Sequence, residues 1–254
     1  MSRSPVTVVD LSGAAPDGIE LAGATHIGPV REENEDTFAA TPMGGGAGVG
    51  LVVADGMGGL PGGGEAAAAA SDAAIASLAA THGENPGPED AVNSGNVAVA
   101  SLREKIGGQP GTTLTVAAVR DGCAVIGHAG DSRAYLVRDG VATVLTTDHS
   151  WVGDQVRSGA LSPGSERRHP RRNIITMAAM GDAIQPQVVR TQLRTGDVLA
   201  LCSDGFWEPL EDTHIATLLE TPGPLTAVVE RAAEAALDAG GTDNVTVLAL
   251  RVAR

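Results

Sequence analysis

The sequence predicts a single α+β domain in which mostly antiparallel sheets are covered by helices on their outer faces. The first observation is the order of the elements: strands, two helices, a block of strands, a helix, strands, helices and a last strand. The second is the short Asp-Gly turns at 121–122 and 139–140, which make the strands on either side antiparallel. The third is that neither an internal repeat nor a Pro/Gly linker divides the 254 residues.

The first half of the chain changes from strand to helix after Gly64. Residues 1–20 mix Ser, Pro, Gly and Asp with a short Val-rich run, and they fit either a loose tail or an added edge strand. We place the domain at residues 21–254, with a buried strand at 49–54. The Ala-rich segment from Glu65 to about Ala80 predicts a helix, and a second helix from Glu89 to Lys105 ends at two glycines.

The second half of the chain is mostly strands. Thr/Val-rich and apolar runs predict strands at 112–119, 123–128, 134–137, 141–146, 187–193, 197–202 and 244–252. Amphipathic patterns predict helices at 151–161, 213–219 and 225–237. The segment 162–173 is polar and rich in arginine, so we expect a solvated, mobile surface loop there.

Composition restricts the class of protein. The formal net charge of −14 argues against a nucleic-acid partner, because few basic side chains are available to neutralise phosphates. Cys123 and Cys202 lie in apolar runs without a CxxC spacing, which indicates free thiols. The N-terminus shows no signal-peptide pattern, and no apolar stretch approaches the length of a membrane span. We therefore expect a cytoplasmic protein without a membrane span.

Asp55 follows the apolar run Leu51-Val-Val-Ala and precedes Gly56. An aspartate at the exit of a buried strand is held rigidly, and the following glycine lets the backbone carbonyls approach a ligand. Hard metal ions take oxygen ligands from both sources. A simple Asp-Gly turn after a strand explains the same residues, so Asp55 alone does not separate the two interpretations.

Acidic residues recur in the same setting, at predicted strand ends beside glycine or another turn former. The further sites are Glu35-Asp36, Asp131, Asp204 and Asp243. Each residue alone fits a turn or a cap. Carboxylates gathered at one end of a sheet repel each other unless a cation neutralises them, so together they make a carboxylate metal centre the competing interpretation.

Six motifs resemble, in order and spacing, the bacterial metal-dependent Ser/Thr protein phosphatases of type 2C. They are Arg31-x-x-Asn-Glu-Asp36, Val52-Val-Ala-Asp-Gly-Met-Gly-Gly59, Gly111-Thr-Thr113, Gly127-His-Ala-Gly-Asp-Ser-Arg-Ala-Tyr135, Cys202-Ser-Asp-Gly-Phe-Trp-Glu208 and Gly241-Thr-Asp-Asn-Val-Thr-Val247. The resemblance covers about residues 22–252. It implies a four-layer α-β-β-α sandwich, with two mostly antiparallel sheets flanked by helices, and a single phosphatase-type catalytic domain over 21–254.

The resemblance also implies a centre for two Mn²⁺ or Mg²⁺ ions, with a third ion in bacterial members. Asp55 would bridge the two ions, and the Gly56 carbonyl would join the first. Asp204 and Asp243 would bind the second ion.

The remaining site residues have more peripheral roles in the same comparison. Glu35 and Asp36 would act near the second ion through its waters, and Asp131 would join Asp204 at the third-ion site. Arg31 would bind the substrate phosphate with its planar fork. The implied reaction is hydrolysis of phosphoserine or phosphothreonine by direct attack of a hydroxide that bridges the ions.

Two positions depart from the family pattern. Met57 stands where many eukaryotic members carry a histidine that protonates the leaving group, so the general acid is unassigned and a metal-bound water is our candidate. Met177 stands where relatives usually show arginine, after a segment that resembles the substrate-contacting flap.

Two functions follow from the resemblance. The first is an active phosphatase that opposes a bacterial Ser/Thr kinase and acts on phosphorylated Ser/Thr proteins, including a cognate kinase and its substrates. The alternative is a catalytically weak, phosphatase-like module that binds phosphoproteins. The mapped acids and Arg31 are all present, which favours the enzyme. We expect it to be a monomer.

Overall fold

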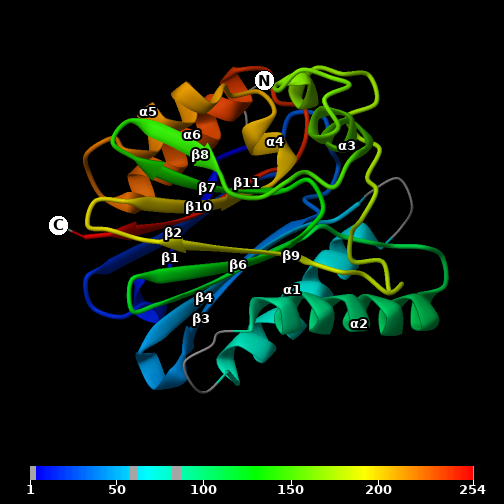
Figure 1. Cartoon of the computed structure of the whole chain (residues 1–254), viewed down its shortest axis with the longest axis horizontal. Coiled ribbons are helices and arrows are strands. Elements are labelled where there is room, and N and C mark those ends of the chain that lie inside the picture. The colour runs from blue at the N-terminus through cyan, green and yellow to red at the C-terminus, as the bar shows by residue number, and fades with distance from the viewer. Residues whose placement is uncertain (1–3, 58–61, 82–86, 254) are drawn as a thin grey trace.

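Two antiparallel sheets lie face to face, and helices cover the outer face of each (Figure 1). The structure is a computed structural model, and it describes residues 4–57, 62–81 and 87–253. Within these ranges one sheet has six strands in the order β1-β2-β11-β10-β7-β8, and the other has five in the order β3-β4-β5-β6-β9. The predicted α-β-β-α sandwich is confirmed.

The strands largely match the predicted apolar runs, with ends that differ by a few residues. The six-stranded sheet contains β1 (Thr7–Asp10), β2 (Ile19–His26), β7 (Arg133–Arg138), β8 (Val141–Val144), β10 (Val198–Cys202) and β11 (Val245–Val252). The five-stranded sheet contains β3 (Asp36–Met43), β4 (Gly48–Asp55), β5 (Leu114–Arg120), β6 (Cys123–Ala129) and β9 (Gln187–Gln192).

Residues near the N-terminus form the edge of the six-stranded sheet. Thr7 to Asp10 pair with Thr25 to Ala22 of β2. β2 itself begins at Ile19, and Ile19 and Glu20 pair with the end of β11. The boundary that we placed between residues 20 and 21 therefore falls inside a strand.

The helices form the two outer layers. α1 (Gly63–Ala79) and α2 (Pro88–Ile106) pack on the five-stranded sheet, and α5 (Asp212–Leu219) and α6 (Leu225–Asp238) pack on the six-stranded sheet. α3 (Trp151–Arg157) is shorter than predicted, and the four-residue α4 (Asp204–Trp207) is not predicted from the sequence. None of the described helices is long and apolar enough to cross a membrane.

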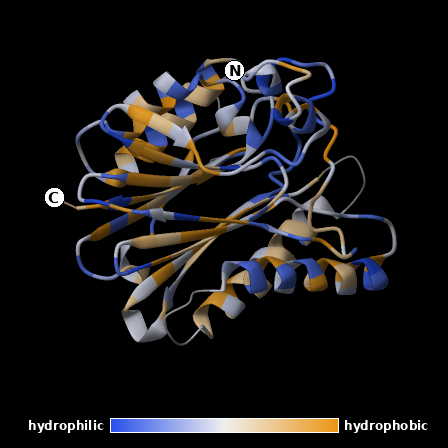
Figure 2. Ribbon diagram, in the orientation of Figure 1, coloured by the Kyte–Doolittle hydropathy of each residue, from blue (hydrophilic) through white to orange (hydrophobic). Residues whose placement is uncertain are grey.

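Small aliphatic side chains fill the core, as the low aromatic content predicts. One apolar cluster lies between the two sheets, and one lies under each pair of helices (Figure 2). A Cβ on Gly95 of α2 would lie 2.9 Å from the Ala70 carbonyl oxygen of α1, so glycine lets these two helices approach closely.

The two ends of the sandwich differ in what they carry. Strands β4, β6 and β10 end, and β3, β7 and β11 begin, at the end where the acidic motifs lie. The turns at 121–122, 139–140 and 195–196 lie at the opposite end, on the left of Figure 1. All the predicted site residues therefore belong to one end.

Candidate metal centre

Asp36 and Asp55 form the part of the site that the five-stranded sheet provides. Asp36 opens β3, Asp55 closes β4, and the two residues lie opposite each other in the antiparallel register. Thr113, the residue before β5, fixes the Asp55 backbone. Its hydroxyl accepts the Asp55 N–H at 3.0 Å, and its own N–H donates to the Asp55 carbonyl at 2.9 Å. The two carboxylates thus stand side by side on a backbone that is hydrogen-bonded on both sides.

Gly56 is packed so tightly that no other residue fits. Its N–H donates to the Glu35 carbonyl at 3.1 Å. A Cβ here would lie 2.4 Å from the Gly63 carbonyl oxygen and 2.8 Å from the Glu35 carbonyl oxygen. The glycine therefore brings the start of α1 and the residue before β3 against the end of β4. The glycines at 58 and 59 of the same motif lie outside the described residues.

Three further carboxylates come from the six-stranded sheet and from the link between the sheets. Asp204 begins α4 directly after β10, and Asp243 lies just before β11. Asp131 lies in the short connection that carries the chain from β6 in one sheet to β7 in the other. The ends of both sheets thus contribute acids to the same region.

Ser203 and Asn244 join the two sheets at this end. The Ser203 hydroxyl donates to Asp36 Oδ2 at 2.7 Å and accepts the Thr246 N–H at 3.0 Å. The Asn244 side chain accepts the Glu35 N–H at 2.9 Å and donates to two carbonyls of the segment before β3. Sequence reasoning gave these residues no role, although both lie inside the quoted motifs beside an acid.

The clustered carboxylates perturb one another. Burial, and next the charge of Asp36, raise the pKa of Asp55 well above its ordinary value. Burial, and next the charge of Asp131, do the same to Asp204. Burial raises the pKa of Asp36 to about 6, against the effect of the Ser203 hydrogen bond. Burial and the charge of Asp148 raise the pKa of Asp131 to about 7. The acids are therefore close together without enough positive charge between them.

This donor set fits a hard divalent cation. The ligands are carboxylates and backbone carbonyls, which Mg²⁺ and Mn²⁺ prefer. Asp36 Oδ1 is buried and has no hydrogen-bond partner among the described atoms. Within the described ranges, no three His, Cys, Asp or Glu side chains are already arranged as a complete ligand set. A cation bound among these carboxylates would offset their mutual repulsion.

Arg31 is the cation at the mouth of the site. Its guanidinium donates to Asp243 Oδ2 at 2.8 Å and lies 3.8 Å from Glu35 Oε2. The side chain is 41% exposed, so it reaches solvent while it touches the acids. A phosphate could bind to its free edge.

A cavity of about 390 Å³ opens beside these residues. Arg31, Asp204 and Asp243 line it, together with Arg172 and Asn173 from the segment after α3. The volume is large enough for a phosphorylated side chain. Cationic and anionic groups thus face each other across one pocket.

The segment 162–173 differs from the prediction made for it. We predicted a solvated loop, but the Arg167 side chain is only 7% exposed and pairs with Asp212. Arg172 pairs with Glu208, whereas Arg168 pairs with Glu211 and is 83% exposed. The arginines are held because the turn after α4 carries acids at matching positions, and the sequence does not show that contact.

Met57 directly follows Gly56, and neither it nor Met177 adds a polar group to the site. The Met57 N–H donates to the Gly111 carbonyl at 2.9 Å, and its side chain packs over Gly111, where a Cβ would lie 2.7 Å from the Met57 methyl. Met177 is half-buried. Neither thioether supplies a proton donor, in agreement with the residue types.

Fold and site together define a two-sheet sandwich with a carboxylate-rich centre suited to divalent cations at one end. The chain belongs to the protein phosphatase 2C family, whose model matches residues 22–239. It is 36% identical over 239 residues to the serine/threonine protein phosphatase PstP of Mycobacterium tuberculosis, covering 91% of this chain and 44% of that protein. It is 39% identical over 138 residues to the protein phosphatase PhpP of Streptococcus pneumoniae, covering 54% of this chain and 56% of that protein.

The solved structures agree with the family. The catalytic domain of PstP in complex with two manganese ions matches with a TM-score of 0.81 at 31% identity, over 98% of this chain and 100% of that one. The chain spans about half the length of the curated relatives that it matches. The structural match thus covers a catalytic domain from end to end.

Proposed function

We propose that this chain is a protein phosphatase that removes phosphate from serine and threonine side chains with Mn²⁺ or Mg²⁺. The observation that supports this function best is the convergence of five aspartates at one end of the sandwich: Asp36, Asp55, Asp131, Asp204 and Asp243. Two of them, Asp204 and Asp243, line an open pocket together with Arg31. The family and the PstP domain that binds manganese support the same activity.

The two sheets would supply ligands to different ions. Asp55 and the Gly56 carbonyl lie on the five-stranded side and would hold the first ion, with Asp55 shared. Asp204 and Asp243 lie on the six-stranded side and would hold the second, with Glu35 and Asp36 orienting its waters. Asp131 and Asp204 would hold a third. When bound, such ions lower the pKa of water and neutralise phosphate charge.

Arg31 would orient the substrate. Its exposed guanidinium can form two parallel hydrogen bonds to a phosphate, which would release Asp243 from the pair seen here. The phosphorylated side chain would enter the pocket beside it, which Asp204 and Asp243 also line. The leaving alkoxide needs a proton, and Met57 does not supply it. Solvent bound at the acids is our candidate for the donor.

The substrates follow from the relatives only as a class. PstP and PhpP are named protein phosphatases, and PstP is named a serine/threonine protein phosphatase. We propose phosphorylated proteins as the substrates of this chain, with a cognate Ser/Thr kinase among them. The cytoplasmic location and the monomeric state stay predictions. The weak, phosphoprotein-binding alternative is not favoured, because the mapped acids are all present.

Hydrolysis of p-nitrophenyl phosphate and of a phosphothreonine peptide, with and without Mn²⁺, tests the proposal. We expect metal-dependent turnover by the wild type and a loss of at least about 100-fold in Asp204→Asn. Asp121→Asn is the matched control, because Asp121 is 85% exposed at the other end of the sandwich. A wild type that is as inert as Asp204→Asn with every divalent ion tried would refute the proposed function.

A further inference from the structure

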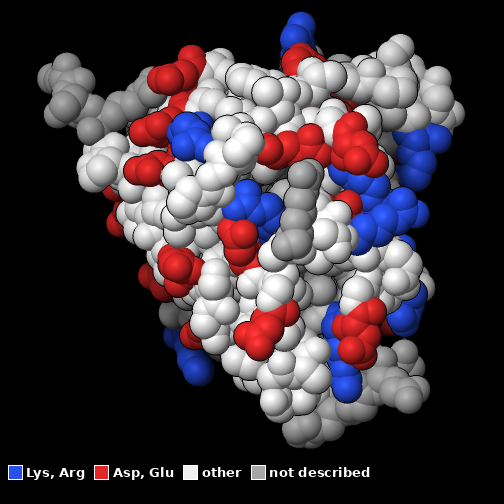
Figure 3. Space-filling model, turned by 90° about the vertical axis from the view of Figure 1, so that its left-hand side faces the viewer, with Lys and Arg blue, Asp and Glu red and all other residues white. Residues whose placement is uncertain are grey.

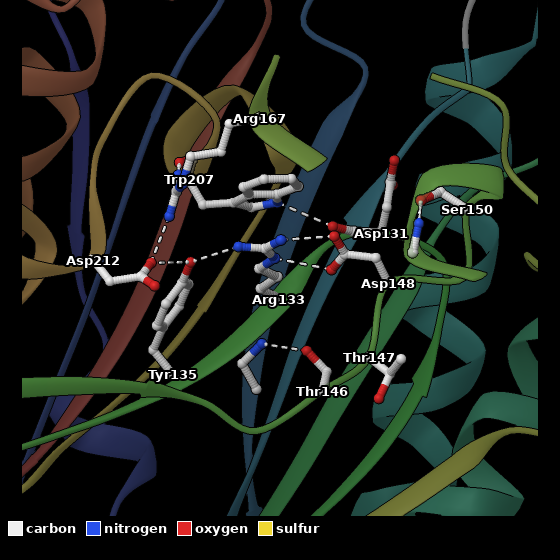
Figure 4. Close-up of polar contacts among 12 residues, drawn as sticks. Asp131, Arg133, Tyr135, Thr146, Thr147, Asp148, Ser150, Arg167, Trp207 and Asp212 are labelled. Atoms are coloured by element: carbon white, nitrogen blue, oxygen red, sulfur yellow. Dashed lines mark hydrogen bonds and ion pairs between the residues drawn. The ribbon is translucent and has the colours of Figure 1, made fainter. Parts of the chain in front are cut away.

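Trp207 lies between two arginines and beside the backbone of Asp131 (Figure 4). Its ring is covered by the Arg133 guanidinium at 3.5 Å from the ring centroid, and Arg167 lies 5.4 Å from the same centroid. Its indole N–H donates to the Asp131 carbonyl at 3.0 Å. Trp207 is the last residue of α4, the helix that Asp204 begins. One side chain thus connects two of the predicted ligand residues.

Arg133 fixes one face of this tryptophan. Its guanidinium makes two hydrogen bonds with the Asp148 carboxylate, at 2.8 and 2.7 Å, and a third with the Tyr135 hydroxyl at 3.2 Å. Arg133, Asp148 and Tyr135 are all buried. Such a paired and desolvated guanidinium over an indole ring is held in one geometry.

Arg167 fixes the other side and comes from the segment 162–173. Its guanidinium donates to the Trp207 carbonyl and to Asp212 Oδ1. The Tyr135 hydroxyl donates to the same Asp212 oxygen at 3.2 Å. The contacts therefore form a closed ring of five side chains at the C-terminal end of α4 (Figure 4). In order, they are Trp207, Arg133, Tyr135, Asp212 and Arg167.

This ring of side chains holds the backbone from which the Asp131 and Asp204 carboxylates project. The Asp131 carbonyl and the start of α4 both move if Trp207 moves, because one is hydrogen-bonded to its indole and the other belongs to its helix. Asp131 and Asp204 are thus linked by one indole hydrogen bond and one short helix. An ion held between them needs both to stay in place.

We propose that Arg167 and Trp207 are positioning residues for the ion site formed by Asp131 and Asp204, so that the segment 162–173 sets the affinity of that site. The inference rests on the proposed function, because it takes Asp131 and Asp204 as ligands. Neither residue is a proposed ligand: Arg167 lines the pocket beside Arg31, but its guanidinium donates to the Trp207 carbonyl and to Asp212. Arg167 and Trp207 act by holding the backbone from which the two carboxylates project.

The experiment compares neighbouring arginines of the same segment. Arg167→Met removes the buried contact, and Arg168→Met is the matched control, because Arg168 is 83% exposed and pairs with Glu211 on the surface. Trp207→Phe keeps the ring and removes the donor to the Asp131 carbonyl. Mn²⁺ binding is measured by calorimetry on each purified protein. The Mn²⁺ concentration that gives half-maximal hydrolysis is measured separately, and circular dichroism checks the fold.

We expect Arg167→Met to weaken the weakest Mn²⁺ site by about tenfold, and to leave the tightest site within about twofold. The half-activating Mn²⁺ concentration rises by the same factor, and kcat returns when Mn²⁺ is raised. Trp207→Phe gives about a threefold shift, the effect of one lost hydrogen bond. Arg168→Met follows the wild type.

Arg167→Met binding that coincides with the wild type, or an equal shift in Arg168→Met, would overturn the positioning role. If Arg167→Met does not fold, Arg167→Lys replaces it. Lysine keeps the charge but cannot bind both the Trp207 carbonyl and Asp212. Mn²⁺ binding by Arg167→Lys that equals that of the wild type would likewise overturn the inference. A wild type that binds no Mn²⁺ would refute the proposed function itself, and this role with it. The two failures are distinguishable, because failure of the proposed function appears in the wild type, whereas failure of the positioning role appears only in the variants.

Discussion

The two ends of the sandwich use acidic residues in opposite ways. At the turn end, Asp197 receives two hydrogen bonds from Arg138 and one from the Arg194 N–H, and Glu20 pairs with Arg251. Figure 3 shows acidic and basic side chains in contact over this face. These partners lower the pKa of Asp197 in spite of its burial.

At the other end, Asp55 and Asp204 face other acids, and their pKa values are raised. Acidic residues occur at both ends, so their presence alone does not identify the site. What distinguishes these carboxylates is their partner: Asp197 pairs with Arg138, whereas no ion pair among the described residues involves Asp55 or Asp204. Carboxylates that lack such a partner are the ones placed to bind an external cation.

The largest expected effect concerns Asp55→Asn. This substitution removes a predicted shared ligand, so we expect kcat/KM with Mn²⁺ to fall by at least about 100-fold. In metal-free protein the same substitution relieves repulsion, so the thermal unfolding midpoint should stay equal or rise. Activity assays and thermal melts on the EDTA-treated protein check both. If the activity of Asp55→Asn stayed within a few fold of that of the wild type, the proposed difference between metal-binding and ion-paired carboxylates would be refuted.

Asp197→Asn is the same substitution at the turn end, and it should behave in the opposite way. It leaves Arg138 without its charged partner, so we expect a loss of about 2 kcal/mol in the free energy of unfolding. Turnover per folded molecule should match the wild type, because Asp197 lies at the other end of the sheets. Urea denaturation measures the loss, and a loss of activity larger than the loss of folded protein would contradict it.

The smallest expected effect is a pH dependence of metal-free stability. Asp36 and Asp131 have folded-state pKa values of about 6 and about 7, against an ordinary value of 3.8. A carboxyl with a raised pKa binds its proton more tightly in the folded state. Its stabilising contribution is therefore complete below the ordinary value and is lost as the pH rises through the folded value.

Mn²⁺ bound at the proposed centre would take the place of these protons. The melting temperature with Mn²⁺ minus that with EDTA should therefore grow by about 5 °C between about pH 5 and about pH 8. Subtracting the EDTA curve from the Mn²⁺ curve cancels the contribution of groups that titrate equally in both. His128 is one such group, and burial lowers its pKa to about 3. A difference that shrinks with rising pH would show that the acids are not mutually destabilising.

Much of the fold and of the acid cluster could be predicted from the sequence, because apolar runs, turn residues and motif order are local. Asp55 illustrates this, since its strand and its glycine are adjacent in the chain. Contacts between distant segments could not be predicted. The Ser203 bond to Asp36 joins residues 167 positions apart, and Arg167 is buried only because Trp207 and Asp212 lie across from it. Helix α4 was missed because four residues carry no periodicity.

The hydrogen bond from Ser203 to Asp36 also has a mechanical consequence. It ties the start of β3 to the end of β10, and so one sheet to the other. The proposed ions would draw on Asp55 from the first sheet and on Asp204 and Asp243 from the second. A loaded centre would therefore fasten the two layers at this end as a cross-link does, while the turn end is held by its apolar packing and its own ion pairs. Loss of metal would then loosen the sandwich from one end only.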